Sequence, residues 1–280
     1  MSFYSDEKSE MIESCEPGKK LHFVTDLAQT PKANLVIVHG LAEYVGRYDP
    51  IASYMVQHGF NVFRYDQPGH GFSYGERGYI SSPDGLSENL KVVVDKVKRD
   101  YFDLPTFVLG HSMGGETVLL YGAKHPGEAD ALAVSDPVSV EKYQSKGLDF
   151  DTIKQLPAHQ TIPNAIGEGL DRDQRIVDKY VADPYVLHEL KAGIFTDCML
   201  AGAEFLQDHA KDITDSILYL QGLEDGLIDY RDSLETYKLI SSKDKELHVY
   251  PKLMHEILND SERKWEIYAE IDHWLSAHIY

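Results

Sequence analysis

Short runs of hydrophobic residues recur along the chain and predict a series of β-strands. Most of the later runs are continuous rather than alternating, and Gly, Pro or Asp bounds them, as in strands buried on both faces. The predicted strands occupy residues 21–24, 35–38, 62–65, 106–109, 131–134, 217–220 and 247–250.

Between these runs the hydrophobic residues follow the period of an α-helix. The predicted helices occupy residues 51–58, 86–101, 113–125, 230–241 and 261–279. Strands that alternate with helices indicate an α/β fold with a mainly parallel sheet and helices on both faces.

The interval from Asp136 to Ser216 breaks this alternation. It contains helical patches but no convincing strand, and Pro and Gly punctuate it. Connections between core elements are usually only a few residues long, so an insertion of this length predicts a helical cap, or lid. We expect the cap at residues 137–190, after the sixth core strand, and the core at residues 1–136 and 191–280. A helix through Phe195, Leu200 and Phe205 should return the chain to the core.

Composition and net charge limit the kinds of ligand that the protein is expected to bind. Hydrophobic residues make up 42% of the 280 residues, enough for a substantial core, and the net charge is −19. This acidic balance argues against binding to nucleic acid or docking on anionic lipid, and it favours a neutral or zwitterionic small molecule. It does not distinguish a monomer from a weak homodimer.

The same sequence features bear on location. The first 20 residues are polar and lack the apolar segment of a signal peptide, and no apolar run is long enough to span a bilayer. Cys15 and Cys198 lie far apart and lack metal-ligand spacing, as expected of thiols in a reducing compartment. We expect a soluble, cytoplasmic protein without stable membrane anchoring.

Two segments match the nucleophile-elbow pattern G-x-S-x-G. Residues 110–114 (GHSMG) lie between a predicted strand and a predicted helix, where the tight turn would lift the Ser112 hydroxyl above the sheet. Residues 71–75 (GFSYG) are instead followed by Gly78 and Pro83, so no helix could hold the strained turn. We therefore predict Ser112 as the nucleophile and Ser73 as a loop residue.

Acyl transfer also requires backbone N–H groups that stabilise an oxyanion. The first donor should be Met113, which follows the nucleophile. The second should be Leu41, because His39 and Gly40 end a buried strand and open a loop. We place His39 and Gly40 in the substrate-binding site, although an ordinary glycine turn would produce the same pattern.

A serine nucleophile needs a base and an orienting acid, in the chain order Ser, Asp or Glu, His. His255 follows the last predicted strand in a short loop and should reach the sheet edge at which the elbow opens. Asp225 lies three residues past Gly222, at the end of the preceding strand, and is the preferred acid. Asp136, after strand 131–134, is the alternative acid.

With these residues in place, the chain resembles the monoacylglycerol lipase/lysophospholipase family of α/β-hydrolases. The most family-specific match is residues 66–78 (DQPGHGFSYGERG). Other matches are residues 39–48 (HGLAEYVGRY), 110–115 (GHSMGG), 222–225 (GLED), 253–255 (LMH) and, in the expected cap, 171–173 (DRD) and 180–184 (YVADP). The chain departs from the family at Asp136-Pro137, where a small residue such as Ser is common, and at Phe23-Val24, where a Trp is expected.

The resemblance implies an α/β-hydrolase fold, a triad of Ser112, Asp225 and His255, and an oxyanion hole of Leu41 and Met113. It implies hydrolysis of monoacylglycerols or lysophospholipids through an acyl-enzyme, without a metal or cofactor. Cap residues that include Ile162 and Ile166 should form the acyl pocket.

Three other classes of protein use the same fold. A short-chain carboxylesterase, feruloyl esterase, thioesterase or carbon–carbon hydrolase would keep the triad and differ in the cap. A non-catalytic binding protein should have lost a triad residue or an elbow glycine, and none is lost. A haloalkane dehalogenase would need a carboxylate at the position of Ser112, which excludes it.

Overall fold

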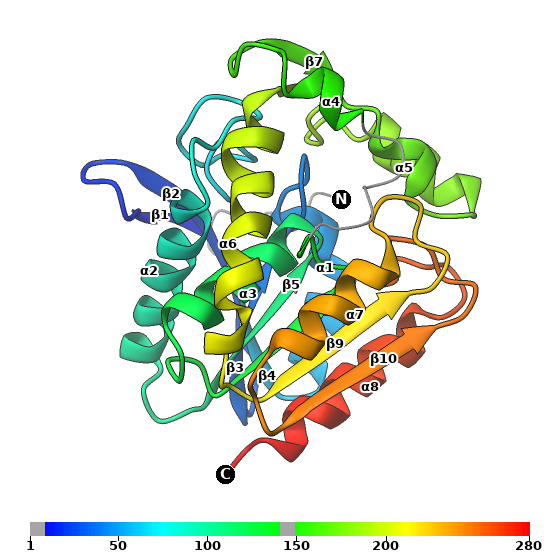
Figure 1. The fold of residues 1–280 in the computed structure, drawn as a ribbon. Coiled ribbons are helices and arrows are strands. Elements are labelled where there is room, and N and C mark those ends of the chain that lie inside the picture. The colour runs from blue at the N-terminus through cyan, green and yellow to red at the C-terminus, as the bar shows by residue number, and fades with distance from the viewer. Residues whose placement is uncertain (1–8, 141–148) are drawn as a thin grey trace.

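A computed structural model describes residues 9–140 and 149–280, and its core is an eight-stranded β-sheet (Figure 1). The strand order is β1-β2-β4-β3-β5-β6-β9-β10, and all neighbours from β4 to β10 are parallel. The strands are β1 (Ser9–Glu13), β2 (Lys20–Asp26), β3 (Ala33–Val38), β4 (Phe60–Tyr65), β5 (Thr106–His111), β6 (Ala131–Ser135), β9 (Ile217–Gly222) and β10 (Lys245–Tyr250).

Each predicted core strand is present, and the mainly parallel α/β architecture is confirmed. The sequence pattern did not predict β1. This strand pairs antiparallel with β2 at the sheet edge, and four of its five residues are at least partly exposed. An edge strand with one buried side chain, Ile12, has no hydrophobic run to mark it.

Helices cover both faces of the sheet (Figure 1). One buried hydrophobic cluster joins the sheet to α1 and α8, and a second joins it to α2, α3 and α6. The core helices are α1 (Asp49–Gln57), α2 (Asp84–Asp100), α3 (Met113–Lys124), α6 (Ala201–His209), α7 (Tyr230–Leu239) and α8 (Lys264–Ala277), with short 3₁₀ turns η2 (Val45–Tyr48) and η5 (Ala210–Asp212).

The described elements between β6 and α6 lie above the carboxyl ends of the parallel strands (Figure 1). These elements are α4 (Phe150–Ile153), β7 (Thr161–Pro163), the 3₁₀ turn η3 (Ile166–Gly169), α5 (Gln174–Ala182), β8 (Glu189–Lys191) and the π-helix η4 (Ile194–Leu200). The expectation of no strand here was wrong, because β7 and β8 pair antiparallel. Each has only three residues, and only Leu190 among them is buried, so neither strand has a hydrophobic run to mark it. Residues 141–148 of the expected cap, like residues 1–8, lie outside the described residues.

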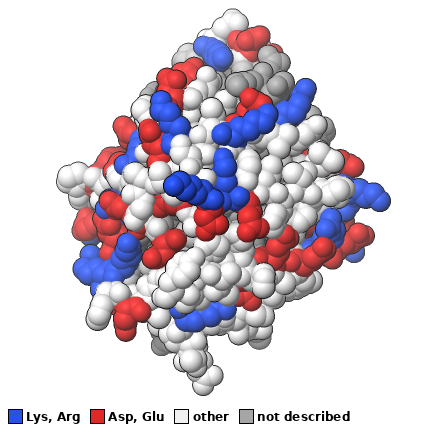
Figure 2. Space-filling view, turned by 60° about the horizontal axis from the view of Figure 1, so that its bottom comes forward, with Lys and Arg blue, Asp and Glu red and all other residues white. Residues whose placement is uncertain are grey.

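On the face shown in Figure 2, Lys and Arg side chains lie among Asp and Glu side chains. Many of these charges are paired, for example Lys91 with Asp95 and Glu128. Cys15 and Cys198 are both free thiols. Within residues 9–140 and 149–280, no helix has both the length and the apolar character needed to cross a bilayer.

Candidate active site

Ser112 occupies a sharp turn between β5 and α3. Its backbone has φ +55° and ψ −121°, an unfavourable conformation for a residue with a side chain. The flanking glycines make the turn possible. A Cβ atom at Gly110 would lie 2.1 Å from the Gly114 carbonyl oxygen, and one at Gly114 would lie 2.2 Å from the Val38 carbonyl oxygen. This is the geometry predicted for a nucleophile elbow.

Ser73, in the second G-x-S-x-G match, has a different environment. Its hydroxyl donates to the Asp66 carbonyl oxygen at 2.5 Å and accepts the backbone N–H of His22 at 2.9 Å. The side chain is buried; its contact with Asp66 closes the loop after β4 on itself, and its contact with His22 joins that loop to β2. Ser73 therefore has a structural role, as the sequence context indicates.

The buried side chains of His255 and Asp225 form a hydrogen-bonded pair. The Nδ1 atom of His255 lies 2.8 Å from Oδ2 of Asp225. The other carboxylate oxygen of Asp225 accepts the backbone N–H groups of Leu227 and Ile228, at 2.8 and 3.0 Å. These contacts fix the carboxylate, which in turn orients the imidazole.

Two opposing effects set the protonation of His255. Burial alone would lower the pKa of its imidazole, but the Asp225 carboxylate outweighs burial and raises the pKa to about 9. Burial and the charge of His255 lower the pKa of the neighbouring His111 to about 3. The centres of the two rings are 4.8 Å apart. Because the pKa of His111 is so low, His255 is the one of the two that can accept a proton near neutral pH.

The loop after β3 brings Leu41, the second expected oxyanion donor, close to Ser112, the expected nucleophile. A Cβ atom at Gly40 would lie 3.2 Å from Cβ of Ser112, so the loop passes directly over the serine. Met113 begins α3 and has no carbonyl partner four residues back within the helix. Among the described residues, the N–H groups of Leu41 and Met113 donate no hydrogen bond.

Contacts from two other segments hold this loop in place. From the loop after β4, the side chain of His70 accepts the Ala42 N–H at 3.1 Å. From the segment above the sheet, Leu187 donates its backbone N–H to the Ala42 carbonyl at 2.9 Å. The Tyr44 hydroxyl also donates to Asp183 at 3.0 Å. The loop after β3, which we call the oxyanion loop for its expected role, is thus held by contacts on two sides.

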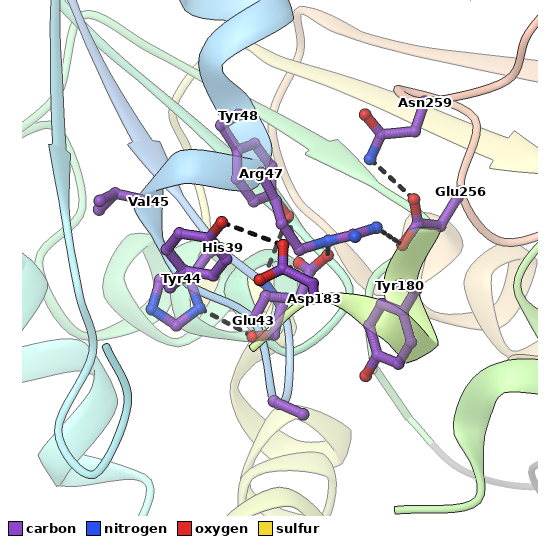
Figure 3. Close-up of polar contacts among 12 residues, drawn as sticks. His39, Glu43, Tyr44, Val45, Arg47, Tyr48, Tyr180, Asp183, Glu256 and Asn259 are labelled. Carbon is purple, nitrogen blue, oxygen red and sulfur yellow. Dashed lines mark hydrogen bonds and ion pairs between the residues drawn. The ribbon is translucent and has the colours of Figure 1, made fainter. Parts of the chain in front are cut away.

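A buried charge cluster, which the sequence did not predict, lies behind the same loop (Figure 3). Arg47 donates to Glu43 at 2.5 Å and also pairs with Glu256, the residue after His255. Its guanidinium lies over the Tyr180 ring of α5, 4.8 Å from the ring centre. Because burial is outweighed by Arg47, the pKa of Glu43 is lowered to about 2. The cluster joins the oxyanion loop, the His255 loop and α5.

A pocket opens at Ser112 and His255. Its lining is mostly apolar and includes Gly40 and Ile166, two of the expected substrate-binding residues, and Leu41, the expected oxyanion donor. The other apolar lining residues are Val138, Leu170, Tyr180, Phe195, Met199, Leu227 and Ile228. The pocket suits an apolar chain whose reacting end lies at the serine.

Two residues expected at the substrate site lie elsewhere. His39 lies outside this pocket lining, because its Nδ1 binds the Gly40 carbonyl at 2.8 Å and its Nε2 accepts the Gln67 N–H at 2.9 Å. It therefore supports the loop from below. Ile162 is also absent from the lining and packs in β7 against the hydrophobic core. Helical periodicity could not separate lining from packing in so short a segment.

Asp136, Asp225 and His255 form a group with metal-ligand chemistry among the described residues. One oxygen or nitrogen of each lies within 4.8 Å of the others. However, Nδ1 of His255 faces Asp225, and backbone N–H groups occupy oxygens of both carboxyl groups. A metal ion would need these same atoms at about 2 Å, so the arrangement fits an acid–imidazole pair better.

The fold and this site define the α/β-hydrolase class. A serine follows the central strand β5 in a strained elbow, and a buried Asp–His pair follows strands β9 and β10. The family described as "Serine aminopeptidase, S33" matches residues 29–262. The chain belongs to this family of serine hydrolases, and it is a carboxylic ester hydrolase similar to monoacylglycerol lipases.

Three similar proteins support that assignment. The monoacylglycerol lipase of Mycolicibacterium smegmatis is 32% identical, over 89% of this chain and 90% of its own length. The human monoglyceride lipase is 30% identical, over 88% of this chain and 83% of its own length. The crystal structure of Paleococcus ferrophilus monoacylglycerol lipase superposes with a TM-score of 0.80 at 27% identity, covering 92% of this chain and 99% of that one.

Proposed function

We propose that the protein hydrolyses monoacylglycerols, with Ser112, His255 and Asp225 as its catalytic triad. The observation that carries this proposal is the mostly apolar pocket that ends at Ser112 and His255. An acyl chain fits such a lining, and a neutral glycerol ester avoids the repulsion that a net charge of −19 imposes on an anionic substrate. The names of the similar proteins support the same substrate class.

The reaction follows from the positions of these groups. His255 removes the proton of the Ser112 hydroxyl, and the serine oxygen attacks the ester carbonyl carbon. The N–H groups of Leu41 and Met113 stabilise the oxyanion. His255 then gives the proton to the departing glycerol oxygen, and a water activated by the same imidazole releases the fatty acid.

In this proposal the segment 137–190 acts as a cap that forms the upper wall of the acyl pocket. Ile166, Leu170 and Tyr180 come from this segment and line the pocket opposite the sheet. The core comprises residues 1–136 and 191–280. The two free thiols further support a reducing, cytoplasmic compartment. A monomer or weak homodimer without stable membrane anchoring remains our expectation.

The test is hydrolysis of a matched panel by wild type and Ser112→Ala. The panel contains 1-monoacylglycerols of short and long chain, lysophosphatidylcholine, p-nitrophenyl esters, methyl ferulate and an aminoacyl p-nitroanilide. We expect turnover of monoacylglycerols, with kcat reduced by about 10⁴-fold or more in Ser112→Ala.

Other outcomes of this panel would change the proposal. Activity confined to short or aromatic esters would keep the triad and reject the lipid substrate. Preference for the anilide would indicate a peptidase. An active Ser112→Ala variant would reject Ser112 as the nucleophile.

A further inference from the structure

One buried carboxyl group beside the proposed triad has no part in the proposed reaction. Asp136 is the first residue after β6, has no exposed surface and adopts φ +45°. A residue with a side chain rarely adopts a positive φ, so the surrounding contacts must hold it there. Its carboxyl group points toward the end of the neighbouring strand β9, from which the Asp225 turn begins.

A hydrogen-bonded amide connects Asp136 to Asp225. Nε2 of Gln221 lies 3.1 Å from Oδ1 of Asp136 and 3.3 Å from Oδ2 of Asp225. The Ser233 hydroxyl donates to the amide oxygen of Gln221 at 2.5 Å, which requires the NH₂ group to face the two carboxyl groups. Gln221 therefore bridges two acids that follow adjacent strands.

The two acids differ in how well a negative charge is stabilised. Asp225 accepts two backbone N–H groups and the His255 imidazole. Asp136 accepts one backbone N–H, from Gly222 at 2.7 Å, and the Ser135 hydroxyl at 3.0 Å. The nearest oxygens of the two carboxyl groups lie within 4.8 Å of each other, so their negative charges repel, and Asp136 has fewer contacts that offset this repulsion. Burial, reinforced by the charge of Asp225, raises the pKa of Asp136 accordingly.

The other titratable groups around Asp136 do not supply a second positive charge. His111 contacts Ser135 at 3.2 Å, and its low pKa keeps it neutral. Tyr219 and Tyr250 are buried phenols whose pKa burial raises further. The charge balance near Asp136 therefore depends on Asp225 and His255.

We propose that Asp136 is a second acid for His255, a positioning residue able to accept the imidazole hydrogen bond in place of Asp225. One of its oxygens already lies within 4.8 Å of a His255 ring nitrogen. Removing the Asp225 carboxylate opens the space between Asp136 and His255 and removes the repulsion that opposes ionisation of Asp136. Asp136 then ionises, and its carboxylate moves to His255. This inference rests on the proposed triad.

The experiment compares Asp225→Ala with the double variant Asp225→Ala/Asp136→Asn. Asparagine keeps the size of Asp136 and an oxygen for the Gly222 N–H, but it cannot ionise. Removal of a triad aspartate from a serine hydrolase commonly reduces kcat by about 10⁴-fold. We expect about a 10²-fold loss in Asp225→Ala and about a 10⁴-fold loss in the double variant, measured with p-nitrophenyl ester.

The pH profile separates positioning from a merely structural role. In Asp225→Ala the carboxylate of Asp136 should keep the pKa of His255 high. The value of kcat/KM should therefore still decrease as the pH falls below an alkaline midpoint. In the double variant this midpoint should move toward the ordinary histidine value of about 6.5. A structural role, which the Asp136→Asn substitution preserves, would leave the midpoint unchanged.

Two controls make the result decisive. Asp225→Ala/Asp229→Asn removes a different buried carboxylate, one that caps α7, and should match Asp225→Ala. If Asp225→Ala does not fold, the pair Asp225→Ser and Asp225→Ser/Asp136→Asn replaces it, because Ser is smaller than Asp and can still accept the N–H groups of Leu227 and Ile228. Equal rates and equal pH midpoints with and without Asp136 would overturn the inference. Failure of a fluorophosphonate to label Ser112 in wild type would instead reject the proposed triad.

Discussion

A carboxylate oxygen of Glu43 accepts the backbone N–H of Gly40 at 2.8 Å. This contact fixes the peptide plane immediately before the proposed oxyanion donor, Leu41. The same oxygen also accepts the Tyr48 hydroxyl at 2.7 Å, while the other binds Arg47. A single buried carboxylate thus connects the geometry of the oxyanion loop to the charge cluster of Figure 3.

Glu43→Gln should therefore reduce both stability and activity. It leaves the buried guanidinium of Arg47 with one acidic partner, and loss of a buried pair costs about 3 kcal/mol or more. We expect a lower Tm by calorimetry and a fall in kcat of about 10-fold or more as the loop shifts. Glu266→Gln, which breaks an exposed pair with Arg263, should change neither quantity. A wild-type Tm for Glu43→Gln would contradict this account.

The two elbow-like serines should respond in opposite ways to alanine substitution. Ser73→Ala removes two buried hydrogen bonds and should lower the free energy of unfolding by about 1–3 kcal/mol. Its kcat and its labelling by a fluorophosphonate should remain close to wild type. Denaturant titration and labelling kinetics check both quantities. Loss of labelling in Ser73→Ala would show that the loop after β4 has a role in the reaction.

Activity and stability should change in opposite directions with alkaline pH. The base form of His255 is neutral, so kcat/KM should rise as pH increases through about 9. The protonated form stabilises the fold, because its pKa lies above the unfolded value. That stabilisation is complete below the unfolded pKa and is lost as pH rises through about 9. Measuring kcat/KM and Tm over the same range of pH tests both expectations. His255→Ala should lose the decrease in Tm that deprotonation of His255 causes.

Gly114→Ala should disrupt the elbow by direct collision. The new methyl group would lie 2.2 Å from the Val38 carbonyl oxygen and 2.6 Å from that of His39, both in the backbone. Neither atom can move without displacing β3 or the oxyanion loop, so we expect lower Tm and kcat. Gly167→Ala meets only ordinary contacts beyond 3.4 Å and serves as the matched control. Its Tm and kcat should remain near those of wild type.

Ile166→Trp should shorten the acyl pocket and change chain-length selectivity. Ile166 is buried and lines the pocket from the cap side. A larger side chain there should reduce kcat/KM for long-chain monoacylglycerols and leave short-chain esters less affected. The ratio of the two values is the measurement. Ile162 lies outside the pocket lining, so Ile162→Trp should preserve this ratio. An equal change of the ratio in both variants would show that the acyl chain binds elsewhere.

The sequence predicted features that depend on local patterns. The core strands are continuous hydrophobic runs, and the elbow needs glycines at fixed spacing around Ser112, so both were apparent without the structure. The sequence pattern did not predict β1, β7 and β8, because few of their side chains are buried. Edge strands and short hairpins are specified by their partners rather than by their own residues.

Long-range contacts were the main features that the sequence did not predict. Arg47 and Glu256 are separated by 209 positions, and nothing in their local sequence indicates that they pair. His39 lies beside the expected oxyanion donor, yet its ring faces Gln67 from another loop. Asp136 was recognisable as an alternative acid from its place after a strand. Its connection to Asp225 through Gln221 requires the adjacency of β6 and β9.

The hydrogen bond from Leu187 to Ala42 has a consequence for substrate selection. It joins the backbone of the cap segment to the backbone of the oxyanion loop. An acyl chain that displaces the cap would therefore also shift the groups that stabilise the transition state. Poorly fitting substrates should then bind and react slowly, so discrimination among them should arise in the acylation rate more than in KM.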